Sequence, residues 1–170
     1  DGDLRAMLRA MFNSDSFKNA QFKKVKNPTE LVAGVLKLVG TFRFPEPGVV
    51  AYDGATKLMG QQLLNPPTVE GWHTGKEWID GGTLNERVNF AVNEIGDASK
   101  PGIQDIINRL AADGGSLSPA EFTDKALDLI GPLPVDQQTH AALMEYAVSV
   151  GSLDFSSKEA REEATPKIVH

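Results

Sequence analysis

The chain has 170 residues, 41% of them hydrophobic, which is enough to bury one ordinary core and a second, smaller packed unit. It contains no cysteine, and this excludes a disulfide framework, a thiolate zinc site and a cysteine nucleophile. The formal net charge is −6, and the acidity lies after Asn93, where 13 acidic residues outnumber 6 basic ones; because an acidic surface repels phosphate, we expect no nucleic-acid binding.

The longest apolar run, Leu31 to Leu36, is followed at once by Lys37 and is far shorter than the roughly 20 residues that cross a bilayer. We therefore expect no membrane span. Residues 1–9 alternate charged and apolar side chains and do not resemble a signal peptide, so any export signal is expected upstream of them.

Residues 3–13 are predicted to form an amphipathic helix. Their apolar side chains follow the spacing of one helical face, with Arg5 and Arg9 on the other side. The face consists of Leu4, Met7, Leu8, Met11 and Phe12.

A lysine cluster follows this helix and is interleaved with Phe17 and Phe22. We interpret it as a solvated connector whose two phenylalanines anchor in the core. The alternative is a grip on nucleic acid or anionic lipid. The cluster consists of Lys18, Lys23, Lys24 and Lys26.

The next helix is predicted to open at Asn27-Pro28-Thr29-Glu30, which combines an N-cap, a proline at the first helical position and a glutamate three residues after the cap. From Leu31 to Val39 only Lys37 is strongly polar, so we expect this helix at the centre of the core. A buried strand is the competing interpretation, and the start signal favours the helix.

Residues 41–48 contain two prolines and a glycine and are predicted to form a loop. Helical spacing resumes from Tyr52 to Leu63 and ends before Pro66. Residues 65–82 hold both tryptophans among prolines and glycines, and are too rich in turn formers for a long helix.

A further helix is predicted to end at Ile95 and to begin with Thr83 as its cap and Glu86 at the third position after it. Beyond Gly96, evenly spaced helical patterns predict a small acidic bundle and a terminal helix. Their expected ranges are 103–110, 118–131, 136–150 and 157–169. The fold class is therefore all-α, an irregular helical domain over residues 1–95 with a Gly/Pro/Trp-rich loop, and an appended helical bundle over residues 96–170.

Two motifs resemble a known family. Residues 60–79 follow the pattern GQxLxxPPTVxGWxxGxxWI, and residues 83–91 follow TLxxRxNFA. Together with the opening DGDLRAMLRAMFNSDSF and the K-x-P-x-E-L-V stretch at Lys26, these resemble DUF1800, a family of uncharacterised bacterial proteins, over residues 1–95. The resemblance implies a larger, helix-rich and often exported protein, and implies no established activity.

The Trp-containing segment supplies the candidate site residues, for which two interpretations stay open. In the first, two tryptophans beside glycines clamp a loop onto the helices, and their indole N–H groups donate to backbone carbonyls. In the second, aromatic faces, carboxylates and a guanidinium line a groove for a sugar or a peptide. The candidates are Trp72, His73, Glu77, Trp78, Asp80 and Arg87.

No catalytic residue, metal site or cofactor is predicted. His73 and Glu77 stand four residues apart, but Gly75 between them makes a helix there improbable, so the spacing does not indicate metal ligation. Nucleophile-elbow and phosphate-loop motifs are absent from the sequence. We expect a non-catalytic structural or interaction module of a larger bacterial protein, with another protein or a glycan as partner. The alternative is part of a carbohydrate-binding or hydrolytic site completed by upstream residues.

Overall fold

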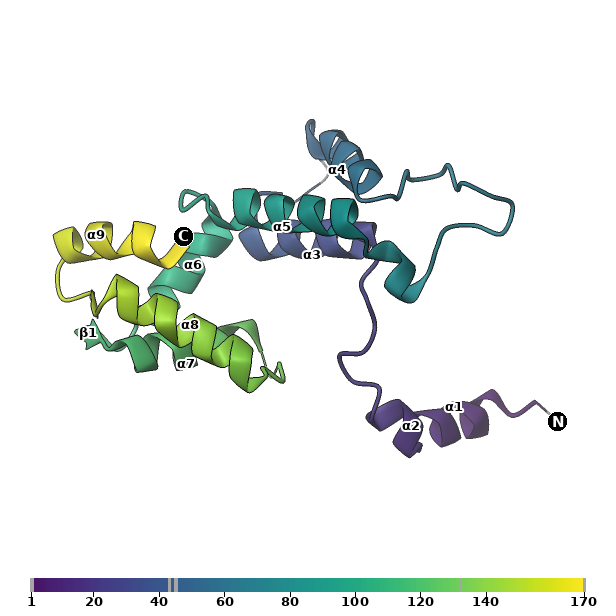
Figure 1. Cartoon of the computed structure of the whole chain (residues 1–170), viewed down its shortest axis with the longest axis horizontal. Coiled ribbons are helices and arrows are strands. Elements are labelled where there is room, and N and C mark those ends of the chain that lie inside the picture. Colours follow the sequence, from purple (N-terminus) through teal and green to yellow (C-terminus); the bar gives the residue numbers. More distant parts are fainter. Residues whose placement is uncertain (1, 43, 45, 132, 170) are drawn as a thin grey trace.

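A computed structural model describes residues 2–42, 44, 46–131 and 133–169 (Figure 1). Arg43 and Pro45 of the predicted loop, and the predicted helix stop at His170, lie outside the described residues. The described chain is mostly helical, which confirms the all-α prediction. Its helices are α1 (Leu4–Asn13), α2 (Asp15–Lys18), α3 (Pro28–Val39), α4 (Tyr52–Leu58), α5 (Gly81–Ile95), α6 (Pro101–Leu110), α7 (Pro119–Ile130), α8 (Gln137–Val150) and α9 (Lys158–Val169), with 3-10 turns η1 (Val49–Ala51) and η2 (Gly75–Trp78) and strands β1 (Ser116–Leu117) and β2 (Leu153–Asp154).

Side-chain caps fix where most helices begin. Asn27, Ser118 and Asp136 each accept a hydrogen bond from the third residue of the helix that follows, as the sequence predicts. The predicted cap of α5 is wrong. Asp80 caps this helix and Thr83 occupies its third position, because the extended backbone at Asp80 lets its carboxylate reach the Thr83 N–H.

Helix α4 is shorter than predicted and ends at Leu58 rather than near Leu63. Gly60 adopts a left-handed φ of 95°, which turns the chain away from the helix axis. The Gln61 side chain then accepts hydrogen bonds from the backbone N–H and the hydroxyl of Thr29, at 2.9 and 2.8 Å. The turn therefore ties the end of α4 to the start of α3.

Helices α3, α5 and α6 form the first core cluster. Val35 and Val39 pack with Ile103 and Ile107, and all four are buried. The expected place of α3 in the core holds for one face of the helix, since Leu38 on its other side is 47% exposed. Among the helices that the structure describes, none is long and apolar enough to cross a membrane.

A second core cluster joins α6 to α7, α8 and α9. Its buried members include Leu110, Phe122 and Leu153. Leu153 lies on β2, which pairs antiparallel with β1 in a two-residue ladder that helical periodicity did not predict. Ile106 and Ile168 pack against both clusters, so the two cores are in contact. The division into two domains at Gly96 stays a prediction.

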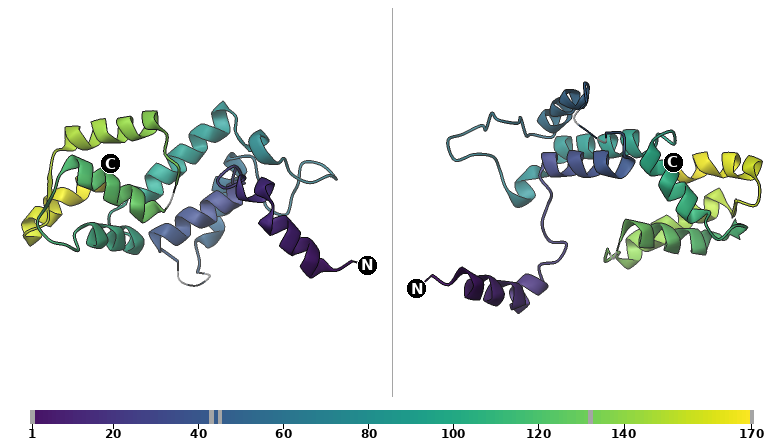
Figure 2. Two further views of the ribbon diagram at one scale, coloured as in Figure 1. Left: turned by 90° about the horizontal axis from the view of Figure 1, so that it is seen from below. Right: turned by 180° about the vertical axis from the view of Figure 1, so that it is seen from behind.

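Helices α1 and α2, with the residues up to Lys23, form an N-terminal arm that stands apart from the body of the molecule (Figures 1 and 2). The amphipathic helix is confirmed, but its apolar face is uncovered, with Leu4 at 69% and Phe12 at 50% exposure. The prediction that Phe17 and Phe22 anchor in the core is wrong. They are about half exposed, because the arm does not fold back onto the core.

Candidate functional site

Side chains from residues 57–83 line a hollow of about 460 Å³ that brings together most of the predicted site residues. The hollow lies beside η2 and the start of α5, where the chain turns twice within a few residues. Gly71 and Gly75 make those turns with φ values of 103° and 59°. The site candidates that line the hollow are Trp72, His73, Glu77, Trp78 and Asp80.

The two tryptophans differ in their surroundings. Trp78 is 5% exposed, and its carbonyl accepts a hydrogen bond of 3.0 Å from the Thr83 hydroxyl, so it anchors η2 to α5. Trp72 is half-buried. The expected donation from its indole to a backbone carbonyl is not present, since the buried Nε1 has no hydrogen-bond partner among the described residues. Of the two tryptophans, only Trp78 is therefore buried as the loop-clamping interpretation requires.

The carboxylates of the hollow serve local caps. Glu77 Oε2 accepts from the Thr74 N–H at 3.2 Å and lies 3.6 Å from His73 Nδ1. Asp80 Oδ1 accepts from the Thr83 N–H at 2.8 Å, and this bond lowers the pKa of the Asp80 carboxyl below its ordinary value. A general acid needs a raised pKa, so Asp80 is unsuited to proton donation.

The cap at Asp80 predicts an acid-sensitive contribution to stability. Because the folded-state pKa lies below the ordinary 3.8, the carboxylate stabilises the fold above that value, and this stabilisation is lost as the pH falls through the folded pKa. Asparagine also caps helices but cannot be protonated in this range. Denaturant unfolding across acid pH should show a shallower loss of stability for Asp80→Asn than for the wild type. Parallel curves would mean that Asp80 does not cap α5 as an anion.

Arg87 does not line the hollow, although the sequence grouped it with the other candidates. It is 8% exposed, and its Nη1 donates to the Lys26 carbonyl at 3.1 Å, which fastens the end of the connector to α5. Its Nε and Nη2 have no partner among the described residues. Burial lowers the pKa of the Arg87 guanidinium. The carbonyl contact gives this arginine a positioning role between two segments.

A family model described as "Protein of unknown function (DUF1800)" matches residues 1–161. The chain belongs to the DUF1800 family. The match extends beyond the residues 1–95 that carry the motif resemblance, and so includes most of the acidic bundle. No curated protein and no solved structure matches the chain.

The two histidines that the structure describes, His73 and His140, do not belong to a cluster of metal-binding side chains. In the part of the chain that the structure describes, no three His, Cys, Asp or Glu residues come together around a common point. His73 is 63% exposed at its side chain and has Glu77 as its acidic neighbour. His140 lies 3.9 Å from Asp124 on α7, near the surface.

Sequence reasoning missed a second hollow, of about 360 Å³, which Trp72, His73 and Trp78 line together with the first. Lys23 and Lys24 line it, together with the buried Gln61. The glutamine stands inside the GQ part of the motif, which was the available signal. Both hollows carry side chains of either charge, since Lys57 joins Glu77 and Asp80 in the first and Glu30 pairs with Lys24 in the second.

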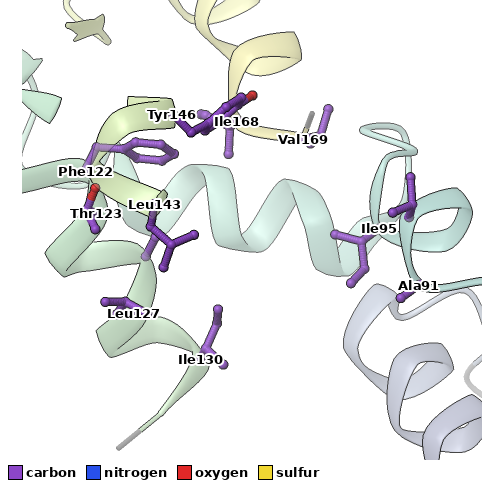
Figure 3. Close-up of a pocket in the computed structure, with 12 residues that line it drawn as sticks. Ala91, Ile95, Phe122, Thr123, Leu127, Ile130, Leu143, Tyr146, Ile168 and Val169 are labelled. Carbon is purple, nitrogen blue, oxygen red and sulfur yellow. The ribbon is translucent and has the colours of Figure 1, made fainter. Parts of the chain in front are cut away.

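The DUF1800 chain also has an apolar groove that no motif indicated. It has a volume of about 470 Å³ and is formed by α5, α7, α8 and the end of α9 (Figure 3). Leu127 and Ile130 stand on one side of the opening, and Ala91 and Ile95 on the other. Its lining is Ala91, Val92, Ile95, Phe122, Thr123, Ala126, Leu127, Ile130, Leu143, Tyr146, Ile168 and Val169.

Proposed function

We propose that this DUF1800 chain is a non-catalytic structural or interaction module of a larger protein. The observation that carries the proposal is the uncovered apolar face of the arm. The apolar residues of α1 are between 46% and 69% exposed, and the helix with which α1 shares an extensive contact in the described chain is its neighbour α2. An apolar face this continuous marks a surface that another protein covers.

The polar chemistry of the Trp hollow supports the same proposal. Glu77 and Asp80 are occupied as caps, and Arg87 is held by a backbone carbonyl away from the hollow. Hydrolysis of a glycosidic bond needs one carboxyl with a raised pKa, whereas the pKa of Asp80 is lowered. These groups stabilise the loop and are not arranged as an acid and a base.

The proposal is tested with Leu8→Glu in the arm. Leu8 is 48% exposed and has no core partner, so the melting temperature should stay within about 1–2 °C of the wild type, since a surface change alters stability by only about 0.5 kcal/mol. In dilute solution, binding of an apolar fluorescent probe should fall. Met59→Glu is the control that should unfold the chain, because Met59 is 1% exposed. A large drop in melting temperature for Leu8→Glu would mean that the apolar face of α1 packs against other residues of the same chain.

A second candidate function is glycan binding at the Trp hollow. It is favoured by the half-buried Trp72, which lines both hollows and offers a ring beside polar groups of either charge. Aromatic faces with a few polar groups are the materials of a sugar site. Titration with soluble oligosaccharides, followed by tryptophan fluorescence, tests this function. Saturable quenching that Trp72→Ala abolishes would promote it over the interaction module.

A further inference from the structure

The chain has two unpartnered apolar surfaces of opposite shape, the convex face of α1 and the concave apolar groove. We propose that the arm of one copy binds in the apolar groove of a second copy, and that the second arm reciprocates. This inference rests on the proposed function, because it names the partner that covers the arm. A reciprocal exchange has two-fold symmetry and leaves neither surface exposed.

The groove is open and apolar enough to receive a helix. On its rim, Val92 is 61% exposed and Ile130 is 68% exposed. A neighbouring hollow of about 640 Å³ shares Ile95, Phe122 and Ile130 with it, so the apolar surface continues between α3 and α7. An open apolar groove of this kind matches the helix-in-groove mode of protein recognition.

The arm has the pattern that such a groove recognises. Leu4, Met7, Leu8 and Met11 occupy positions i, i+3, i+4 and i+7, the usual anchors of a bound helix. Ten helical residues extend about 15 Å, a length that presents all four anchors to one groove. The Phe12 and Phe17 rings pack edge to face with their centroids 5.0 Å apart, so α1 is in contact with α2.

Charge favours a second copy over a lipid surface. Residues 1–26 contain six basic and three acidic side chains, whereas residues 96–170 contain six basic and twelve acidic ones. Exposed Asp124 and Asp128 follow the groove residues Thr123 and Leu127 in the sequence of α7, and Arg5 and Arg9 lie on the side of α1 away from its apolar face. The net charge of −6 opposes approach of the whole chain to an anionic membrane.

The connector directs the arm away from its own groove. Lys24 pairs with Glu30, the Lys26 carbonyl accepts from Arg87, and Asn27 caps α3, so the last residues before α3 are fixed to the body. The arm leaves from this anchored stretch at the end of α3 that lies far from α7 and α8 (Figures 1 and 2). A groove on another copy is therefore the accessible one.

The test is the molar mass in solution, measured by light scattering on a sizing column over a range of protein concentrations. The wild type should form a dimer. Leu8→Glu in the arm and Ile130→Glu in the groove should each shift the mass to that of a monomer. Both positions are exposed, so neither change should prevent folding. Val69→Glu is the matched control, because Val69 is fully exposed on the Trp loop and belongs to neither surface.

Mixing the two monomeric variants gives the decisive result. Leu8→Glu keeps an intact groove and Ile130→Glu keeps an intact arm, so one arm-in-groove contact should form and yield a heterodimer. A monomeric wild type, or a mixture that stays monomeric, would overturn the inference. A monomer that pellets with anionic vesicles would assign the arm to lipid instead. If the wild type is monomeric while Leu8→Glu still lowers probe binding, the second copy fails as partner and the proposed function stands.

Discussion

Replacing Trp78 with alanine is expected to lower the free energy of unfolding by about 3–5 kcal/mol, the range for removing a large buried aromatic side chain. Trp78 is 5% exposed and lies in η2, between the end of the Trp loop and the first turn of α5. Its loss leaves a cavity beside the turn, where the backbone carbonyl of residue 78 accepts a hydrogen bond from the Thr83 hydroxyl and joins η2 to α5. Replacing the half-buried Trp72 with alanine should lower the free energy of unfolding by about half as much, because this side chain removes less apolar area from water.

Denaturant unfolding of the two alanine variants measures this difference, with Trp78→Phe as the conservative control. Phenylalanine refills most of the cavity, so it should recover much of the lost stability. Equal stability of the wild type and Trp78→Ala would contradict the anchoring role. If Trp72→Ala instead unfolds normally while losing an oligosaccharide ligand, the glycan-binding candidate replaces the structural one for this ring.

Local signals predicted the helix starts well where the capping side chain and its partner are three residues apart. Asn27 with Glu30 and Ser118 with Glu121 form such capping boxes, and both are confirmed. The start of α5 was misplaced because Asp80 and Thr83 form a similar pair one turn earlier. The sequence analysis considered only Thr83 with Glu86, whereas the extended backbone at Asp80 makes Asp80 the cap.

The candidate site was predictable in part, because most of its residues lie within one short segment that must fold together. Arg87 follows this segment in the sequence, but its side chain reaches the Lys26 carbonyl, a partner 61 residues away that sequence proximity does not reveal. The arm and the apolar groove show a second limit of prediction from the sequence. Periodicity identifies the apolar side of α1 or α7, but whether that side is covered depends on segments far away in the sequence.

A close approach between α3 and α6 at Gly102 predicts that a single added methyl group will lower stability. Gly102 stands in the first turn of α6, where this helix crosses the end of α3. A Cβ atom at this position would overlap the Leu38 carbonyl oxygen and lie 2.8 Å from the carbonyl carbons of Leu38 and Val39. These are backbone atoms of a helix and cannot rotate aside. We therefore expect Gly102→Ala to cost at least the upper end of the range of about 1–3 kcal/mol for overpacking.

Gly54→Ala is the matched control. Gly54 lies inside α4, and a Cβ atom there would meet nothing within 4 Å, so alanine should stabilise the helix by about 0.5–1 kcal/mol. The two substitutions are chemically identical and should shift the denaturant midpoint in opposite directions. Because Val39 and Ile103 belong to one core cluster beside this crossing, separating α3 from α6 should also increase amide exchange in both helices. A Gly102→Ala variant as stable as the wild type would mean that the two helices do not approach this closely in solution.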